Sequence, residues 1–505
     1  MGPDATGPAA QPIRAGDSVV GAENSRVAAN TVLSLVAILA LGLTRLIFSL
    51  LVSHRLGAAV LGRVNTQLSV ATFASLAFAT GTSVAATKFV PAALGRGDEQ
   101  QARRALLLLT RWCVLGTVVT TIAAALILPW LRPPLSVREI FATCLLIVAY
   151  SAYTFVRGAQ YGYGKVRRYA AIEVFCDSLA VAGALLVVLL HVNALLLLPF
   201  VTGYILFAVL GWLGLPRSAA GPGSALPVAL SREMRGYGVW AALGIMASTG
   251  FLQLSMVFAY HYGARHEVGF YAAALVLTVP AYFVPRALSM ALFPSMAHAF
   301  GRGDTEEIRR QVDAGTRLLM VASLPCFAGA ILLARPVLRV VFQPSYAHAH
   351  LVLELLLAAT YVAIVSIPAV NSLSATQHAL VRVPAFAALA GTSIGVICWL
   401  LLGPRLGITG IATGYLAGTF VASGSNMYVS WRRWQQSWTT LLLRVGAAAV
   451  VTGLLWALVD AVDAGLLIRS GAIVVVTMAT ALLCPYETRQ VISRLRLVVA
   501  QARAG

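Results

Sequence analysis

The chain has 505 residues, of which 59% are hydrophobic and only 11% are charged, and its formal net charge is +19. Soluble globular chains carry roughly 25% charged residues, so this composition excludes an ordinary water-soluble fold. The positive charge does not indicate a nucleic-acid partner, because the basic residues stand in short gaps between apolar runs rather than along a solvated stripe. We therefore predict an all-α, polytopic membrane protein.

The apolar runs predict many membrane crossings. Residues 1–25 are rich in Gly, Ala and Pro and are expected to form a disordered cytoplasmic tail. The first apolar run is longer than the roughly 7 to 15 residues of a signal-peptide core, so we expect it to stay as an anchor. Because a helix needs about 20 apolar residues to cross the hydrocarbon, the sequence predicts about 14 crossings. They lie near 27–52, 66–90, 105–129, 138–158, 171–191, 193–215, 236–260, 268–297, 317–342, 349–373, 384–403, 408–430, 440–461 and 465–484.

The predicted crossings fall into three groups. Six form a first lobe at 26–215, and six form a second lobe at 236–431, with a Gly/Pro/Ser-rich cytoplasmic linker at 216–235 between them. Two further helices occupy 432–484, and 485–505 form a basic amphipathic tail expected to lie on the inner membrane surface. Basic residues are concentrated in alternate gaps between the runs, which predicts that both termini are cytoplasmic.

A short repeat relates the two lobes. The tetrapeptide GRGD occurs at Gly95–Asp98 and at Gly301–Asp304, each time between the second and third predicted helix of a lobe. The offset of 206 residues also separates Gly57 from Gly263. We interpret the lobes as parallel repeats of one unit. The motif itself needs no ligand, because glycine can end one helix and aspartate can cap the start of the next.

Four motifs carry a resemblance to a known family. They are LGAAVLG at Leu56–Gly62, GTSVAATKFVPAALGRGD at Gly81–Asp98, LFPSMAHAFGRGD at Leu292–Asp304 and LGITGIATGYLAG at Leu406–Gly418. With them the chain resembles the polysaccharide and oligosaccharide-lipid flippases of the multidrug/oligosaccharidyl-lipid/polysaccharide (MOP) exporter superfamily. The resemblance implies two six-helix lobes around a V-shaped central cavity, two added C-terminal helices, and alternating access. It also implies transfer of an undecaprenyl-pyrophosphate-linked saccharide from the inner to the outer leaflet of a bacterial-type cytoplasmic membrane.

Basic residues inside the apolar runs are the candidates for cargo binding. Arg45 lies in the outer part of the first predicted span, Arg286 about midway along the eighth, and Lys88 at the inner end of the second. A charge in hydrocarbon is costly and usually faces a cavity or a partner, and arginine can bind phosphate oxygens through two parallel hydrogen bonds. We predict that these side chains bind the pyrophosphate. The alternatives are a buried pairing for the arginines and a headgroup contact for Lys88.

Acidic residues in the spans have two interpretations. Glu173 and Asp177 share a face of the fifth predicted helix near its inner end, where pairing with a neighbouring arginine is favoured over proton coupling. Glu354, near the outer start of the tenth, leaves the same choice open. Proton or sodium coupling therefore stays an alternative, and no cofactor is expected. His348 and His350 lack a nearby acid or cysteine, which makes them a poor metal site and favours solvated loop residues.

Three other functions compete with the glycan flippase. A cation-coupled drug antiporter of the same superfamily favours an acid in the first-lobe core, whereas the first predicted helix offers Arg45. A peptidoglycan-precursor flippase would use cavity arginines in the same way. A membrane glycan polymerase or ligase would need acids or histidines in a large outer loop, and the predicted outer loops are short, so a transporter is expected rather than an enzyme. The expected partners are a lipid-linked glycan, membrane lipids, and glycan polymerases or glycosyltransferases, without nucleic acid.

Overall fold

The computed structural model describes residues 39–131, 133–216, 226–376, 380, 382–462, 464–490 and 493. The predicted tail at 1–25 and most of the predicted amphipathic tail at 485–505 lie outside the described residues. Within the described ranges the chain is almost entirely helical and contains no strand, which confirms the predicted all-α class.

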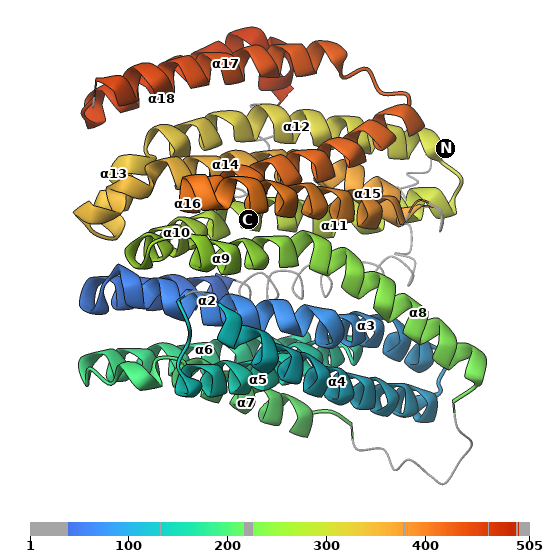
Figure 1. Ribbon diagram of the computed structural model, residues 1–505. Helices are drawn as coiled ribbons and strands as arrows, with labels where there is room; N and C mark the ends of the chain where they lie inside the picture. The colour runs from blue at the N-terminus through green and yellow to red at the C-terminus, as the bar shows by residue number, and fades with distance from the viewer. Residues whose placement is uncertain are drawn as a thin grey trace, which may run out of the picture.

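The first lobe forms the lower half of the view in Figure 1. Its helices are Leu39–Leu56, α2 (Ala58–Ser75), α3 (Gly81–Gly95), α4 (Glu99–Ile127), α5 (Val137–Gly162), α6 (Val166–Leu189) and α7 (Leu198–Leu213). A π-helical segment, η1 (Leu76–Thr80), joins α2 to α3. These two helices therefore form a single long crossing.

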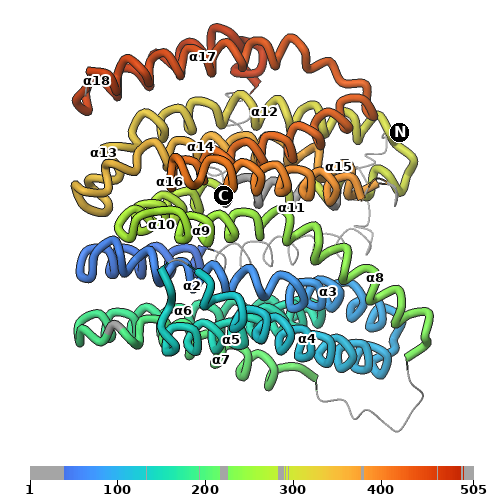
Figure 2. The backbone as a smooth tube through the Cα atoms, viewed as in Figure 1, coloured from blue at the N-terminus to red at the C-terminus, as the bar shows by residue number. Residues whose placement is uncertain are grey.

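The second lobe lies above the first, and two further helices lie at its far edge (Figures 1 and 2). Its helices are α8 (Val228–Ile245), α9 (Phe251–Tyr262), α10 (Arg265–Thr278), α11 (Phe283–Gly301), α12 (Thr305–Leu332), α13 (Ala334–Val341), α14 (His350–Val365), α15 (Ile367–Ala375) and α16 (Arg382–Arg433). The π-helical segment η4 (Met246–Gly250) joins α8 to α9, and a 3-10 turn, η5 (Val279–Tyr282), joins α10 to α11. The added pair is α17 (Thr439–Ala461) and α18 (Leu466–Leu483).

The described helices account for the predicted number of crossings. Eleven of them are long and apolar enough to span a membrane, and Leu198–Leu213 is a shorter apolar helix. The broken helix α10–α11 supplies another crossing. A further one arises because Gly407, with φ 54° and ψ −133°, divides α16 into two helices. The described part of the chain thus holds the fourteen expected crossings, in groups of six, six and two.

Two helix boundaries differ from the prediction. The motif Leu56–Gly62 is not a loop: Gly57 alone makes the turn, with φ 87°, and α2 begins at Ala58. Likewise α8 begins at Val228, inside the segment 216–235 that was predicted as linker. Both differences have one cause. An apolar run marks only the part of a helix that lies in hydrocarbon, whereas the helix itself continues into the polar interface. The helices are therefore longer than the runs.

The predicted caps of the GRGD motifs are confirmed. The Asp98 carboxylate accepts a hydrogen bond from the backbone N–H of Gln101 at 2.7 Å, and Asp304 accepts one from Glu307 at 2.9 Å. The preceding glycines, Gly97 and Gly303, have φ of 75° and 74°, a conformation that favours glycine. The motif therefore forms the same helix-turn-helix corner in each lobe, as expected for a repeat.

The two lobes meet most closely where α2 crosses α10, at the ends predicted to face outwards. A Cβ on Gly269 would lie 2.0 Å from the carbonyl oxygen of Ala58, and a Cβ on Gly62 would lie 2.6 Å from the backbone nitrogen of Gly269. Helices in lipid associate through such close backbone packing, because lipid tails offer no hydrophobic drive. The contact therefore closes the predicted outer side of the molecule with glycines from both lobes.

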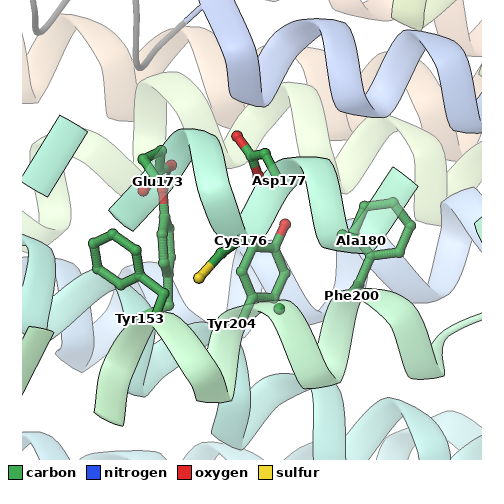
Figure 3. A pocket seen from close by; sticks show the side chains of 9 residues that line it. Tyr153, Glu173, Cys176, Asp177, Ala180, Phe200 and Tyr204 are labelled. Atoms are coloured by element: carbon green, nitrogen blue, oxygen red, sulfur yellow. Dashed lines mark hydrogen bonds between the residues drawn. The ribbon is translucent and has the colours of Figure 1, made fainter. Parts of the chain in front are cut away.

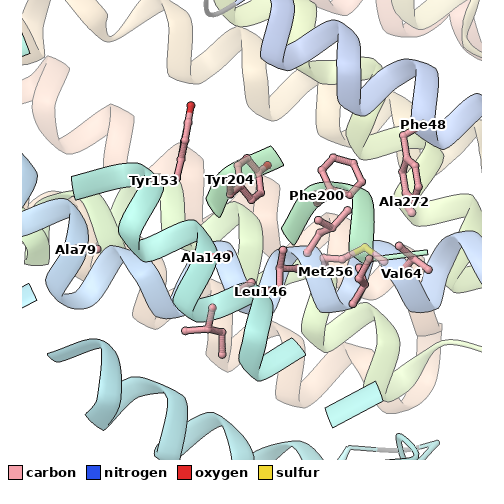
Figure 4. Packing of buried hydrophobic residues seen from close by; sticks show 14 of the residues in the cluster. Phe48, Val64, Ala79, Leu146, Ala149, Tyr153, Phe200, Tyr204, Met256 and Ala272 are labelled. Carbon is pink, nitrogen blue, oxygen red and sulfur yellow. The ribbon is translucent and has the colours of Figure 1, made fainter. Parts of the chain in front are cut away.

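The buried core passes from one lobe to the other. Phe48 of the first helix packs edge-to-face against Phe200 of α7, with ring centroids 4.7 Å apart. Leu146 of α5 and Met256 of α9 belong to the same buried cluster (Figure 4). The lobes thus share apolar packing near α2 and α9, which positions the polar groups described below.

Arg317 of α12 attaches the added helices to the second lobe. Its Nε donates to both carboxylate oxygens of Asp313, at 2.9 and 2.8 Å, and its Nη1 donates to Glu487 at 2.9 Å. Its Nη2 donates to the carbonyl of Ser437 at 3.2 Å, and the indole of Trp438 donates to Asp313 at 2.8 Å. This network fastens the start of α17 and the residues after α18 to α12.

Candidate functional site

Arg45 lies inside the first lobe, within the helix Leu39–Leu56. It precedes the end of that helix by 11 residues, about 17 Å of helix, and the predicted end of the apolar run at residue 52 by 7 residues, about 10 Å. Arg45 is therefore a cation inside an apolar run, where a charge needs a functional or structural reason.

The side chains in direct contact with Arg45 are polar and aromatic. Its Nη2 donates to the hydroxyl of Thr72 on α2 at 3.2 Å, and its guanidinium carbon lies 6.0 Å from the ring centroid of Tyr150 on α5. Tyr150 packs edge-to-face on Tyr204 of α7, with centroids 5.0 Å apart. Among the described residues, no carboxylate oxygen lies within 4.0 Å of an Arg45 nitrogen. Arg45 Nε is buried without a described hydrogen-bond partner.

Two buried acids lie on successive turns of α6, and the nearer to Arg45 is Asp177. Glu173 is 1% exposed and Asp177 is 9% exposed. The hydroxyl of Tyr153 donates to Glu173 Oε1, and Arg157 in turn donates to the Tyr153 hydroxyl at 3.4 Å. The predicted pairing of Glu173 with a neighbouring arginine thus takes an indirect form, through a tyrosine. Asp177 lies within electrostatic range of both Arg45 and Arg157.

The two acids line a small cavity between α5, α6 and α7. Figure 3 shows Glu173 and Asp177 on neighbouring turns of α6, above the rings of Tyr204 and Phe200. The cavity measures about 10 Å³, the size that holds roughly one water molecule. Glu173 Oε2 and Asp177 Oδ2 are buried without a hydrogen-bond partner among the described residues. A buried carboxylate oxygen without a partner is costly.

Lys88 lies where α3 packs on α8. Its Nζ is 3.8 Å from Glu233 Oε1 and 4.2 Å from the ring centroid of Tyr237, both on α8. The lysine and glutamate side chains are 43% and 61% exposed, so the pair is solvated and contributes little to stability. Lys88 therefore lies at the contact between α3 and α8, on the predicted inner side, and it keeps an exposed side.

Arg286 is assigned to α11, but its side chain lies outside the described residues. The structure therefore places its backbone in the broken crossing α10–α11 and does not define its contacts. The prediction that Arg286 binds cargo stays a prediction. The helix break at η5 precedes it by a few residues, at a position that corresponds to η1 in the first lobe.

Glu354 belongs to a polar cluster far from Arg45, between α14 and the added helices. It is 6% exposed, and its charged neighbours are Asp460, Arg469 and Arg335. Arg469 is 3% exposed and donates to the carbonyls of Ala464, at 3.0 Å, and Leu332, at 2.8 Å. The cluster joins α18 to the end of α12, which favours a structural role for Glu354 over ion coupling.

His350 also belongs to this cluster, contrary to the prediction of a solvated loop residue. Its Nε2 lies 3.9 Å from Asp460 Oδ1, and its side chain is 20% exposed. The residue begins α14 rather than standing in a loop. Its position in the first helical turn places it next to Asp460, near the end of α17. This contact depends on the tertiary fold and cannot be predicted from local sequence.

The predicted outer loops contain four acids, Glu139, Glu267, Asp460 and Asp463. Glu139 forms an ion pair of 3.0 Å with Arg63 and caps α5. Glu267 accepts from the backbone N–H of Ala264 at 3.0 Å, and Asp460 lies 3.8 Å from Arg335. Asp463 lies outside the described residues. The three described acids therefore act as caps and ion-pair partners.

Sequence reasoning missed the tyrosines of the site. Tyr150, Tyr153 and Arg157 recur at three- and four-residue intervals, so they share one face of α5. Their hydroxyl and guanidinium groups, in an otherwise apolar helix, are a signal from which that face could have been identified. Tyr204 and Thr72 carried no comparable signal, because only the tertiary fold brings α7 and α2 next to the first helix.

Two family models match the sequence. The model described as a polysaccharide biosynthesis protein matches residues 98–351, just over half of the chain. The model described as the lipid II flippase MurJ matches residues 238–482. No curated protein matches the sequence.

Solved structures share the fold at low sequence identity. Lipid II flippase MurJ, in an inward closed conformation, has a TM-score of 0.67 at 11% identity, covering 90% of this chain and 99% of that chain. A multidrug resistance transporter of the MATE family, in an inward-facing conformation, has a TM-score of 0.64 at 15% identity, covering 78% and 94%. A MOP superfamily transporter from Pyrococcus furiosus has a TM-score of 0.61 at 15% identity, covering 81% and 95%. These likenesses establish the fold.

Proposed function

This chain belongs to the polysaccharide biosynthesis proteins of the MOP superfamily, and we propose from that membership that it is a flippase for a lipid-linked saccharide. It is a multi-pass integral membrane protein and a transporter rather than an enzyme. The proposed cargo is an undecaprenyl-pyrophosphate-linked oligosaccharide or polysaccharide repeat unit. It moves from the inner to the outer leaflet of a bacterial-type cytoplasmic membrane, in which both termini face the cytoplasm.

The observation that carries this proposal is the environment of Arg45. It is a cation inside an apolar span, and no described carboxylate oxygen lies within 4.0 Å of its nitrogens. A permanent positive charge in that position disfavours a cationic cargo and attracts an anionic one. A pyrophosphate is anionic and offers oxygens in the geometry that the guanidinium fork binds.

The proposed transport cycle uses the two lobes as rigid units. In the described conformation α2 and α10 close the predicted outer side through the contact between Gly62 and Gly269. The cargo head enters from the inner side, where Lys88 and the arginines attract it, and the lipid tail stays in the bilayer. Separation of α2 from α10, with closure at the inner ends, then releases the head to the outer leaflet. The breaks η1, η4 and η5 are places where these long crossings can bend.

Glu173 and Asp177 are the proposed sites of energy coupling. Each has a buried carboxylate oxygen without a described hydrogen-bond partner, and both line the same cavity. A proton or sodium ion bound there changes the charge beside Arg45. Such binding could therefore alter the affinity of Arg45 for an anionic cargo, which is what coupling between two sites requires.

Glu173→Gln is expected to remove the response of transport to an imposed proton or sodium gradient. The amide has nearly the shape of the carboxylic acid and can still accept from Tyr153, but it cannot gain or lose a proton. The measurement is the initial rate of cargo transfer in proteoliposomes with and without each gradient. Glu354→Gln is the matched control, because Glu354 is a buried acid in the cluster that holds the added helices. An equal gradient response in wild type and Glu173→Gln would exclude Glu173 from coupling.

Two rival functions each have one supporting observation. The match of residues 238–482 to the MurJ model favours a peptidoglycan-precursor lipid as cargo. A cation-coupled drug antiporter favours an acidic group in the first-lobe core, which the first predicted helix does not contain. The buried acids Glu173 and Asp177 of α6 supply such a group and so favour this second rival. In that case Arg45, beside the acids, would have to tolerate a cationic drug.

Depletion of the protein identifies the cargo in cells. We expect an undecaprenyl-pyrophosphate-linked repeat unit to accumulate on the inner leaflet, while the peptidoglycan precursor stays at its normal level. The measurement is mass spectrometry of extracted lipid-linked saccharides, before and after depletion. Accumulation of the peptidoglycan precursor alone would support the first rival. Unchanged levels of both lipids, with increased drug sensitivity, would support the second.

A further inference from the structure

The inner half of α8 presents a second basic site, which the predicted cargo residues do not include. Arg232 and Arg235 line a hollow of about 540 Å³, together with Ser231, Val239 and Trp240. Arg232, Arg235 and Val239 recur at intervals of three and four residues, so they share one face of the helix, and Ser231 and Trp240 lie at its two borders. That face carries two positive charges, with an aromatic ring at its border.

Both arginines are exposed, and their charges have no acidic partner in the described part of the chain. The ion pair described in this region joins Lys88 to Glu233, which lies on a different face of α8. No described carboxylate oxygen lies within 4.0 Å of a nitrogen of Arg232 or Arg235. Arg235 lies 5.7 Å from the ring centroid of Trp112 on α4, which fixes its direction without neutralising it.

This face lies where the lobes meet. On one side, α8 packs on α3 so closely that a Cβ on Gly81 would lie 2.6 Å from the carbonyl oxygen of Gly238. On the other side, Trp240 contacts α16. The guanidinium carbon of Arg382 lies 5.7 Å from the ring centroid of Trp240, and the ring centroids of Trp240 and Phe386 are 6.2 Å apart. The hollow is lined by residues 226–240 of the second lobe, and the contact of Arg235 with Trp112 places it beside the first lobe.

The length of the crossing places the arginines at headgroup level. The continuous helix from Val228 to Tyr262 has 35 residues, about 52 Å at 1.5 Å per residue, whereas hydrocarbon is about 30 Å thick. Divided evenly between the two ends, the excess of about 22 Å places the first two turns of α8 beyond the hydrocarbon on the predicted inner side. Arg232 and Arg235 lie in these turns, at the depth of lipid phosphates. Basic residues are common at this depth because they set the orientation of membrane proteins. That role alone does not explain why these two arginines line a hollow and why Arg235 contacts the other lobe.

We propose that this face of α8, centred on Arg232 and Arg235, binds the phosphate-bearing headgroup of an inner-leaflet lipid. Two guanidinium forks one turn apart suit a diphosphate, which has oxygens for each fork. Trp240, 44% exposed, supplies an apolar surface beside the charged groups. The proposal rests on the proposed function: in a flippase this site is the place where the cargo head docks before it reaches Arg45. An anionic phospholipid has the same phosphate chemistry and is the other source of such a headgroup.

The test is lipid binding by the purified full-length protein, measured by native mass spectrometry titration. The probes are undecaprenyl diphosphate, undecaprenol, which lacks phosphate, and phosphatidylglycerol. The variant is Arg232→Gln with Arg235→Gln. The matched control is Arg432→Gln with Arg433→Gln, which removes two exposed charges at the predicted inner end of α16. Thermal unfolding and the variant with lysine at both α8 positions establish that any loss reflects charge rather than misfolding.

We expect the α8 variant to bind undecaprenyl diphosphate roughly tenfold or more weakly than wild type, with the control within about twofold of wild type and the lysine variant in between. Equal weakening for phosphatidylglycerol would support a phosphate site and assign it to lipids in general. Unchanged binding by the α8 variant, with wild type preferring undecaprenyl diphosphate to undecaprenol, would overturn this inference and leave the flippase proposal standing. No preference for undecaprenyl diphosphate in wild type would overturn both.

Discussion

Arg45→Ala is expected to abolish transport of the lipid-linked cargo while the protein stays at normal abundance in the membrane. Arg45 donates to Thr72 at 3.2 Å and lies over Tyr150, but it holds no acid of the described chain in an ion pair. Its removal therefore costs the fold little. A lost charge-assisted contact to phosphate is worth about 1.5–3 kcal/mol, which lowers transport at limiting cargo roughly 10- to 150-fold. The measurement is glycan export in depleted cells that express each variant.

Two further variants separate charge from structure. Arg45→Lys is expected to impair export less than alanine, because the charge remains without the fork. Arg469→Ala removes a buried arginine that donates to two backbone carbonyls, so it should lower protein abundance rather than export per molecule. Arg286→Ala is expected to behave like Arg45→Ala. Normal export in both Arg45→Ala and Arg286→Ala would refute the assignment of these charges to the cargo.

Gly269→Leu is expected to stop transport by preventing closure of the predicted outer side. A Cβ at this position would lie 2.0 Å from the carbonyl oxygen of Ala58, so α10 and α2 must move apart. Overpacking of this kind costs roughly 1–3 kcal/mol, and here the cost falls on one state of the cycle. We therefore expect a loss of transport together with a shift towards an outward-open state.

Cysteine labelling measures that shift. Leu61 is fully buried beside the contact, and a cysteine in its place should react with a membrane-impermeant maleimide from outside in Gly269→Leu but not in wild type. Gly453→Leu is the matched control, because nothing lies within 4 Å of a Cβ at Gly453. Equal labelling in all three backgrounds would show that the glycine contact does not control access. Labelling only from the cytoplasmic side would show that the predicted orientation is reversed.

The number of crossings, their grouping and the caps of the GRGD corners could be predicted because they depend on local sequence. Apolar runs of sufficient length become helices in lipid, and the Asp98 cap involves a backbone N–H only three residues away. The helix breaks at η1 and η4 were harder to predict from the sequence. The segments η1, with the sequence LAFAT, and η4, with the sequence MASTG, share no local pattern that predicts a π-helical form.

The candidate site could be predicted only in part. Arg45 stood out because a charge in an apolar run is rare, and Glu173 and Asp177 stood out for the same reason. Their proximity to one another could be expected only within α6, from the helical repeat. That Arg45 lies near Asp177, and that Tyr153 stands between Arg157 and Glu173, follows from how the first helix, α5 and α6 pack together. A single sequence carries no information about that packing.

Direct transfer in a reconstituted system tests the central claim. The purified protein is placed in proteoliposomes with an undecaprenyl-pyrophosphate-linked repeat unit, and a membrane-impermeant glycosidase outside reports how much of the saccharide becomes accessible with time. The proposal predicts that wild type exposes the inner pool much faster than protein-free liposomes do, and that Arg45→Ala does not. Equal exposure with and without the protein would contradict the account, as would wild-type transfer that Arg45→Ala leaves unchanged.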